Sequence, residues 1–274
     1  MVAGITDKRP IGIFDSGIGG LTVAGAIHKA LPNEDLIYFG DTAHLPYGDK
    51  SPALIRKWSK RIASFLVDKN VKMIVIACNT ASAAAYQTLL KHVPHDIPIV
   101  NVITPTAKYV ANKYDKKKIG VIGTKGTISS RVYVRKINKF NPKLKITSQA
   151  TPLLAPMIEE GYFNNNISKA IIYSYLDKPA FKNIAALILG CTHYPMIKKE
   201  VKSFYDGATE VIDSAEMVSK RVKEVLVKKK LLRTEKHQPK HRFFISDYTE
   251  SFASSTKIFF KGNISLKKKN LWVD

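Results

Sequence analysis

Two apolar runs along the chain each end in a cysteine. One lies in residues 71–82 (VKMIVIACNTAS) and ends at Cys78, and the other lies in residues 184–195 (IAALILGCTHYP) and ends at Cys191. Short continuous apolar runs of this kind are typical of buried parallel strands. Ligands of α/β proteins bind beyond the carboxyl ends of such strands, so both thiols are predicted to lie where chemistry takes place.

Apolar runs and amphipathic stretches alternate along the rest of the chain. Further strands are predicted over residues 10–16, 35–40, 97–102, 118–123, 145–150, 210–213 and 241–246. Helices are predicted after the glycines at 17–20, from Ser51 and Pro52, from Thr104 onward, over 214–232 and over 252–260. This alternation favours a parallel α/β architecture, and the two cysteine-bearing halves look like related domains that face one another.

The helix predicted from Ser51 has a recognisable start and a recognisable buried face. Ser51 is a suitable N-cap, and Pro52 fits the first helical position. The apolar side chains on the face predicted to pack on the core are Leu54, Ile55, Trp58, Ile62, Phe65 and Leu66. The tryptophan of this set is therefore assigned to the core and not to a cofactor site.

Length and composition bound the class of protein. A chain of 274 residues, 45% of them hydrophobic, is long enough for two globular domains. No apolar run approaches the roughly 18 residues of a membrane span, and the first ten residues lack the core of a signal peptide, so we expect a cytoplasmic protein. Two cysteines far apart in such a chain favour free thiols, and no clustered ligands indicate a zinc site.

The chain carries a formal net charge of +22. A balance of this kind attracts polyanions or acidic small molecules. The charge is spread along the sequence, however, and no nucleic-acid-binding motif accompanies it. We therefore favour a solvated basic surface, and nucleic acid is not an expected partner.

Polar residues follow two other predicted strands. Asp15 and Ser16 end the strand over 10–16 and precede three glycines, but Thr22 stands where a dinucleotide fingerprint has its third glycine. The strand over 118–123 leads into a turn, TKGT at 124–127, whose backbone N–H groups can bind carboxylates or phosphates. The chain has no P-loop sequence.

Paired thiols suit one reaction class in particular. Few thiols are ionised at pH 7, but a helix N-terminus lowers the pKa of a cysteine, and both cysteines are expected to lie just before helices. A lone cysteine at a strand end is more often a small buried hydrophobe. Two cysteines in matching positions instead suit two bases on opposite sides of a carbon, which invert a stereocentre by proton transfer without a metal or cofactor. Nearby Asn, Thr and Ser groups can stabilise the charge that develops on a substrate carboxylate.

Six segments occur in the order in which one enzyme family carries them. They are FDSGIGGLTV at 14–23, YFGDTAHLPYG at 38–48, ACNTASA at 77–83, GVIGTKGTI at 120–128, PLLAPMIEEG at 152–161 and LGCTHYP at 189–195. In combination they closely resemble the bacterial glutamate racemases, which belong to the cofactor-independent aspartate/glutamate racemases. The resemblance covers nearly the whole chain. It departs at Thr151, where many members have a cysteine, but this change removes no catalytic group.

The resemblance implies a fold and a set of roles. It implies two pseudo-symmetric parallel-sheet α/β domains with the active site in the cleft between them, one formed by 1–101 plus 214–274 and the other by 102–213. Cys78 and Cys191 would be the acid/base residues, one for each enantiomer. Asp15 would assist Cys78, while His193 and one glutamate, Glu159 in preference to Glu160, would assist Cys191. The residues implied to hold the substrate are Asp15, Ser16, Tyr47, Gly48, Asn79, Thr80, Thr124, Thr127, Thr192 and His193.

The function implied is interconversion of L- and D-glutamate to supply D-glutamate for peptidoglycan, with no cofactor, metal or membrane. Two alternatives stay open: a related racemase acting on aspartate or another amino acid, and a basic regulatory protein associated with nucleic acid or DNA gyrase. A thiol-redox role lacks the C-x-x-C pair that such chemistry uses. The sequence leaves the oligomeric state open, a homodimer included.

Overall fold

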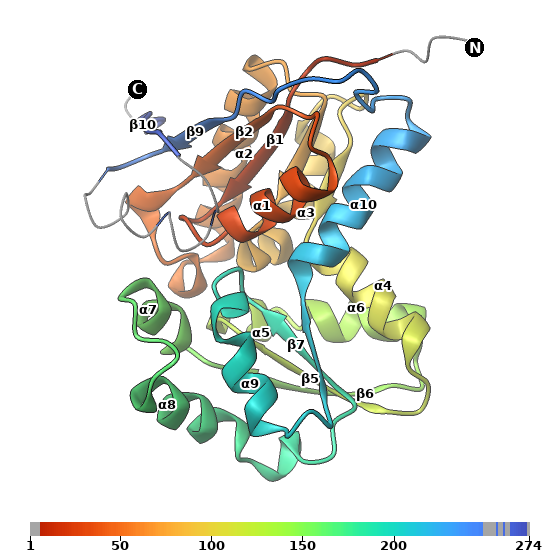
Figure 1. The fold of residues 1–274 in the computed structure, drawn as a ribbon, viewed down its shortest axis with the longest axis vertical. Helices are drawn as coiled ribbons and strands as arrows, with labels where there is room; N and C mark the ends of the chain where they lie inside the picture. The colour runs from red at the N-terminus through yellow and green to blue at the C-terminus, as the bar shows by residue number, and fades with distance from the viewer. Residues whose placement is uncertain (1–5, 249–255, 257–259, 261–263, 273–274) are drawn as a thin grey trace. The chain divides into compact units, whose positions relative to one another are not determined.

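The protein consists of two compact units. The structure, a computed structural model, describes residues 6–248, Thr256, Phe260 and 264–272. Unit 1 comprises Met1–Val102 with Ala215–Asp274, and unit 2 comprises Ile103–Ser214 (Figure 1). Unit 2 is thus an insertion in unit 1, and the boundaries expected after residues 101 and 213 differ by one residue from these.

Unit 1 is built on a six-stranded parallel sheet in the order β10-β9-β2-β1-β3-β4. The central strands have no accessible surface on either face, which explains their continuous apolar sequences. The strands are β1 (Ile11–Asp15), β2 (Leu36–Gly40), β3 (Met73–Ile76), β4 (Ile99–Asn101), β9 (Arg242–Ile245) and β10 (Leu266–Lys268).

Helices cover both faces of this sheet. They are α1 (Leu21–Ala30), α2 (Pro52–Asp68), α3 (Asn79–His92) and α10 (Ser214–Lys228), with the short 3₁₀ helices η1 (Thr42–His44) and η2 (Tyr47–Asp49) after β2. Figure 1 shows α1 and α10 in front of the sheet and α2 and α3 behind it. As predicted, Ser51 caps α2 by accepting a hydrogen bond from the N–H of Leu54 at 3.3 Å, and Pro52 is its first residue.

Unit 2 has a four-stranded parallel sheet in the order β6-β5-β7-β8. Its strands are β5 (Lys118–Gly123), β6 (Lys145–Ala150), β7 (Ala186–Gly190) and β8 (Glu210–Asp213). Its helices are α4 (Ile103–Lys113), α5 (Lys125–Ser129), α6 (Val132–Phe140), α7 (Leu154–Glu159), α8 (Asn166–Leu176) and α9 (Lys198–Phe204), with the 3₁₀ turns η3 (Pro179–Phe181) and η4 (Tyr194–Ile197). The parallel α/β architecture predicted from the sequence is confirmed in both units.

The two sheets share one strand order. Counted along the chain, four strands of each unit run second, first, third, fourth, and unit 1 adds β9 and β10 beyond its second strand. In such an order the chain turns opposite ways after the first and third strands, and ligands bind at the crevice this opens. Cys78 follows the third strand of unit 1, and Cys191 follows the third strand of unit 2. The pseudo-symmetry expected from the two cysteine runs is therefore present in the topology.

Two helix predictions were wrong in detail. Leu54 is 43% exposed, because it lies about 100° from the centre of the buried stripe that Ile55 and Ile62 define on α2. The helix predicted over 214–232 ends at Lys228: Lys230 adopts a left-handed φ of 58°, and the N–H of Leu231 bonds back to the carbonyl of Leu226 at 2.8 Å.

The C-terminal region was the hardest to predict. Strand β10 was missed, because its sequence, LKK, is half-buried to exposed at the edge of the sheet and lacks an apolar pattern. The helix predicted over 252–260 lies outside the described residues except for Thr256 and Phe260.

The helix expected from Thr104 begins one residue earlier, at Ile103. None of the helices in the described part of the chain has both the length and the hydropathy to cross a membrane.

Candidate active site

Cys78 joins the third strand of unit 1 to the helix behind it. The residue is 5% exposed and is the N-cap of α3, where its Sγ accepts a hydrogen bond from the N–H of Ala81 at 3.3 Å. The thiol also donates to Ser16 Oγ at 3.6 Å. Both the backbone donor and the positive end of the helix dipole favour a negative charge on this sulfur. The predicted position of Cys78 just before a helix is confirmed.

The glycine turn after β1 holds a carboxylate of the chain itself. Asp15 is fully buried, and its Oδ2 accepts hydrogen bonds from the N–H groups of Gly17 at 3.3 Å and Gly20 at 2.9 Å. A Cβ at Gly20 would come within 2.6 Å of Asp15 Cβ, so the close approach requires glycine there. Amides that a dinucleotide fingerprint aims at a pyrophosphate are thus bound to Asp15.

A buried carboxylate anchors the loop after β2. Asp41 accepts hydrogen bonds from the hydroxyls of Tyr47 at 2.7 Å and Ser246 at 2.8 Å, and its Oδ2 lies 2.9 Å from His44 Nδ1. Burial, with Asp41 beside the ring, raises the pKa of Tyr47 well above its ordinary value, so the phenol stays protonated and donates. This network fixes η2, which contains the predicted substrate residues Tyr47 and Gly48.

Two further predicted residues lie next to Cys78. Asn79 and Thr80 are the first residues of α3, and they are 2% and 4% exposed. Ser16, at the end of the neighbouring strand, is half-buried. In unit 1 the structure therefore gathers the predicted residues around the ends of β1 and β3, with Tyr47 in the same core cluster as Cys78.

Cys191 has an ionisable partner in place of a helix. The residue is 8% exposed, and its Sγ lies 3.6 Å from Nδ1 of His193. On the other side of the imidazole, Nε2 lies 2.9 Å from Oε1 of Glu159, the last residue of α7. Glu160 is exposed. Of the two glutamates left open by the sequence, the structure places Glu159 against His193.

His193 is stabilised in its charged form. Burial alone would lower the pKa of this imidazole, but the hydrogen bonds to Cys191 and Glu159 outweigh burial and raise its pKa well above the ordinary value. A protonated His193 can donate from both ring nitrogens, from Nδ1 toward the Cys191 sulfur and from Nε2 toward Glu159.

The helix expected just after Cys191 is a short 3₁₀ helix and not an α-helix like the one after Cys78. A turn and the four-residue η4 follow Cys191, and α9 begins only at Lys198. The segment after Cys191 forms only a short 3₁₀ helix, which begins at Tyr194 with Pro195 as its second residue. The group beside the Cys191 sulfur is thus the His193 imidazole and not the terminus of an α-helix.

Hydroxyl groups border the matching strand ends of unit 2. Thr124 is the N-cap of α5, and its hydroxyl accepts from the N–H of Thr127 at 3.4 Å and lies 3.1 Å from the Thr127 hydroxyl. Thr192, beside Cys191, is 4% exposed. The polar turn predicted after β5 therefore exists, in the place that the Asp15 turn occupies in unit 1.

The sequence did not single out three supporting residues, Asp41, Tyr194 and Ser246, whose hydrogen bonds hold the segments that carry the predicted site residues. Asp41 and Tyr194 stand inside quoted motifs, which was the available signal, whereas Ser246 carried none. Tyr194 is fully buried, and its hydroxyl lies 2.7 Å from Oγ1 of Thr151, which in turn donates to the carbonyl of Gly123 at 3.3 Å. Thr151, the departure noted in the sequence, thus ties the ends of β5 and β6 to the segment after Cys191.

The two thiol sites contain acids, bases and hydrogen-bond donors. Within the described part of the chain, no group of three His, Cys, Asp or Glu residues is arranged to hold a metal ion. Both cysteines are free thiols. Each site can exchange a proton through sulfur and can donate hydrogen bonds to an anionic ligand.

Known proteins of one family match this chain over most of its length. The family model described as Asp/Glu/Hydantoin racemase matches residues 19–222. A glutamate racemase of Geobacter metallireducens is 42% identical over 93% of this chain and 94% of its own length. The structure of a Francisella tularensis glutamate racemase in complex with D-glutamate has a TM-score of 0.91 at 42% identity and covers 97% of this chain and 99% of that one.

A Thermus thermophilus glutamate racemase in complex with β-chloro-D-alanine gives a TM-score of 0.86 at 36% identity, covering 96% of this chain and 98% of that one. Fold, length and sequence therefore agree across these relatives. The chain belongs to the Asp/Glu/hydantoin racemase family and is a racemase.

Proposed function

We propose that this racemase interconverts L- and D-glutamate by transferring protons between the α-carbon and two cysteines, Cys78 and Cys191. The observation that carries the proposal is the pair of thiols at equivalent strand ends of two sheets with the same strand order. The similarity to glutamate racemases, one of them bound to D-glutamate, supports the choice of substrate.

In the proposed reaction one cysteine, as thiolate, takes the α-proton, and the other, as thiol, returns a proton to the opposite face. The electron pair of the broken C–H bond stays on the carbon and its carboxylate until the new C–H bond forms. In the reverse direction the two sulfurs exchange roles. Proton transfer by groups positioned in this way accounts for roughly 10²–10⁴-fold of the acceleration in characterised enzymes.

The neighbouring groups are proposed to prepare each thiol and to hold the substrate. His193, kept charged by Glu159, stabilises the Cys191 thiolate, and Asp15 assists Cys78 from the end of the neighbouring strand. We propose that the substrate's carboxylates and ammonium are held by Asp15, Ser16, Gly48, Asn79, Thr80, Thr124, Thr127, Thr192 and His193. The Tyr47 hydroxyl is engaged by Asp41, so Tyr47 is proposed to fix the Gly48 segment.

We further propose that the D-glutamate produced is used for peptidoglycan, and that the enzyme acts in the cytoplasm. Two free thiols as the acid and base fit a compartment that keeps cysteines reduced.

A second candidate substrate is aspartate, because the matching family model includes aspartate racemases in its description. The deciding experiment follows loss of optical activity of L-glutamate, D-glutamate and L-aspartate in D₂O, without added cofactor. We expect racemisation of glutamate, with one solvent deuteron at the α-carbon of each product molecule. Turnover of aspartate with no turnover of glutamate would overturn the choice of substrate.

A further inference from the structure

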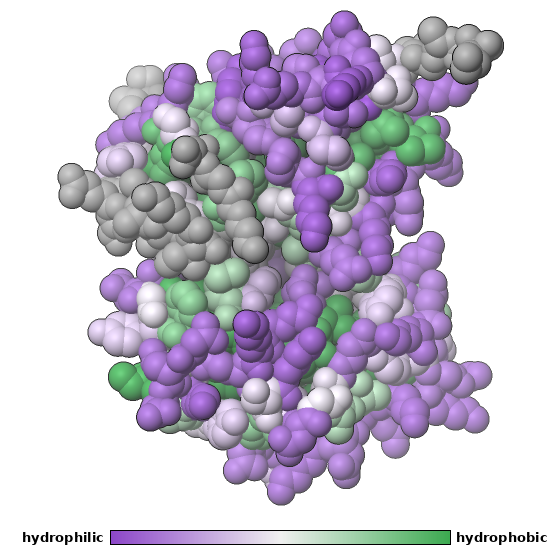
Figure 2. Space-filling view, in the orientation of Figure 1, coloured by the Kyte–Doolittle hydropathy of each residue, from purple (hydrophilic) through white to green (hydrophobic). Residues whose placement is uncertain are grey.

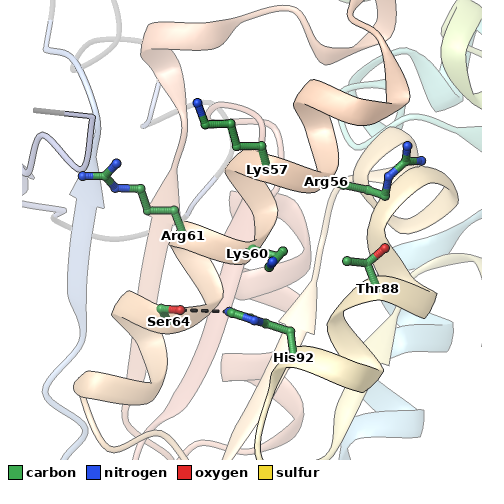
Figure 3. Close-up of a pocket in the computed structure, with 7 residues that line it drawn as sticks. All are labelled: Arg56, Lys57, Lys60, Arg61, Ser64, Thr88 and His92. Carbon is green, nitrogen blue, oxygen red and sulfur yellow. Dashed lines mark hydrogen bonds between the residues drawn. The ribbon is translucent and has the colours of Figure 1, made fainter. Parts of the chain in front are cut away.

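Helices α2 and α3 of unit 1 form a groove that is distinct from the cluster of residues around Cys78. We call it the basic groove, and it is lined by Arg56, Lys57, Lys60, Arg61, Ser64, Thr88 and His92, with a volume of about 570 Å³ (Figure 3). Ser64 on α2 and His92 on α3 meet across it, with Ser64 Oγ 2.9 Å from His92 Nε2. None of the residues assigned to the racemase reaction is among them.

The charged side chains that line the basic groove are all positive. Two arginines and two lysines come from a single face of α2, and none of the seven described lining residues is acidic. Of these cations, Arg56, Lys57 and Lys60 form no ion pair within the part of the chain that the structure describes. The positive charge of the groove is therefore directed at solvent.

This arrangement differs from the first turns of α10. On α10, Lys220 lies 2.7 Å from Glu216 one turn away, and Arg221 lies 3.1 Å from Glu224, so cations and carboxylates alternate. Figure 2 shows hydrophilic side chains over most of the face in view, as expected for a net charge spread over the molecule. The basic groove gathers four cations within that charge, and three of them, Arg56, Lys57 and Lys60, have no acidic partner among the described residues.

The concentration destabilises the helix that carries it. Arg56 and Lys60 are four residues apart and Lys57 and Lys60 three apart, so like charges are neighbours on the surface of α2. No described contact offsets this repulsion, but a bound polyanion removes it. Arginine suits bidentate contacts to phosphate oxygens, lysine suits point contacts, and Ser64 and Thr88 add hydroxyl donors.

We propose that the basic groove binds a small anion that carries several phosphate groups. Its volume lies in the usual range for small-molecule sites, and its cations come from a rigid helix. A phosphate chain matches the spacing of cations along α2, where successive pairs are one helical turn apart. The phosphates of a nucleic acid share this chemistry, and the test separates the two sources.

The test measures binding of inorganic tripolyphosphate to the full-length protein by titration calorimetry at physiological salt. We expect saturable binding of one tripolyphosphate per chain. In the variant R56Q/K57Q/K60Q the affinity should fall at least tenfold. The control variant K223Q/K228Q/K229Q removes the same charge from exposed positions, two on α10 and one directly after it, and should change the affinity less than twofold.

Three results would overturn the proposal. They are the absence of saturable tripolyphosphate binding, an equal loss of affinity in both variants, and binding of a DNA duplex through these residues without binding of tripolyphosphate. The second result would mean a diffuse charge effect, and the third would assign the groove to nucleic acid. An unfolding temperature no lower than that of the wild type in both variants keeps loss of fold from imitating loss of binding.

Discussion

The two thiol sites occupy equivalent places in two similar sheets, yet their surroundings differ. Cys78 is held by backbone: it caps an α-helix, accepts from the N–H of Ala81 and contacts the Ser16 hydroxyl. Cys191 is held by side chains: His193 lies beside its sulfur, and Glu159 lies beyond the imidazole. In the proposed reaction, the thiol of unit 1 is therefore prepared by a fixed dipole and the thiol of unit 2 by a titratable ion pair.

This difference teaches that topology can repeat while electrostatics does not. A helix N-terminus offers partial charge that no pH change removes, whereas an imidazolium offers a full charge that is lost above its pKa. We therefore expect the two directions of the proposed reaction to respond differently to pH and to substitution, and the following experiments test that asymmetry.

The largest effects are expected from removing either sulfur. In Cys78→Ala and in Cys191→Ala, racemisation of glutamate should fall by roughly 10³-fold or more, because each leaves one face of the carbon without an acid or base. Each variant keeps one thiol and should still exchange the α-proton of one enantiomer slowly with D₂O, and the favoured enantiomer should be opposite in the two variants. Full racemisation by either variant, with an unchanged unfolding temperature, would refute the two-base proposal.

A smaller loss is expected when the ion pair behind Cys191 is weakened. Glu159→Gln removes one of the two contacts that raise the pKa of His193, so that pKa should fall. The alkaline limb of the pH profile should then move to lower pH, with roughly a tenfold loss of rate near pH 8, for the enantiomer that Cys191 deprotonates. The neighbouring Glu160→Gln is the matched control and should behave as the wild type, since Glu160 is exposed. An equal shift in both variants would contradict the role given to Glu159.

A still smaller effect is expected on the other thiol. Ser16→Ala removes the hydroxyl that Cys78 contacts at 3.6 Å, and it should cost about 1 kcal/mol, or roughly a fivefold loss of rate, in the direction that starts at Cys78. The pH profile should keep its limbs, because serine does not titrate in this range. Ser174→Ala, which removes an exposed hydroxyl in unit 2, serves as the control. A shift of the alkaline limb of the pH profile in Ser16→Ala would contradict the proposed difference between the Cys78 and Cys191 sites.

The smallest effect on the reaction is expected at a half-buried histidine of unit 1, His241, whose titration affects stability and not the thiols. His241 accepts from the N–H of Leu36 at 3.2 Å and lies 3.0 Å from His28, and burial together with His28 lowers its pKa to about 4. Above pH 6.5, the ordinary pKa of histidine, the His241 imidazole is neutral in both the folded and the unfolded state. As the pH is lowered from 6.5 to 4, His241 is protonated in the unfolded state before it is protonated in the folded state. The free energy of unfolding therefore decreases as the pH falls, by about 1–3 kcal/mol from this group.

His193 contributes a pH dependence of stability opposite in sign to that of His241. Because its folded pKa is raised, its contribution to stability is complete below pH 6.5 and is lost as the pH rises through the folded value. Chemical unfolding of the wild type, His241→Asn and His193→Asn between pH 4.5 and 8 measures both slopes. Acid loss of stability that is identical in the wild type and His241→Asn would refute the assignment to His241.

Much of the fold followed from the sequence because its signals are local. The apolar runs ending at Cys78 and Cys191 are strands, and the Ser51-Pro52 cap starts α2. The edge strand β10 escaped because a strand with little buried surface needs no apolar pattern. The exposure of Leu54 escaped because the limits of a buried stripe are set by the neighbouring helix and not by the helix itself.

The candidate site was predictable in its residues but not in its contacts. Thiols, hydroxyls and carboxylates at strand ends could be seen in the sequence, and the resemblance ordered them into roles. That Asp15 is bound by its own glycine turn, and that Glu159 and not Glu160 meets His193, depends on side-chain direction. Ser246 reaches Asp41 from a distant part of the chain, which no local pattern can reveal.

The insertion of unit 2 into unit 1 has a consequence for synthesis on the ribosome. Unit 2 is a continuous segment and can complete its sheet as soon as Ser214 has emerged. A β2 strand that forms at that stage lacks its neighbour β9, whose residues 242–245 come later, so we expect its outer edge to be an open template for pairing with other chains. The nascent enzyme therefore passes its most aggregation-prone moment between residues 214 and 245, with one thiol site already assembled and the sheet that carries the other still unfinished.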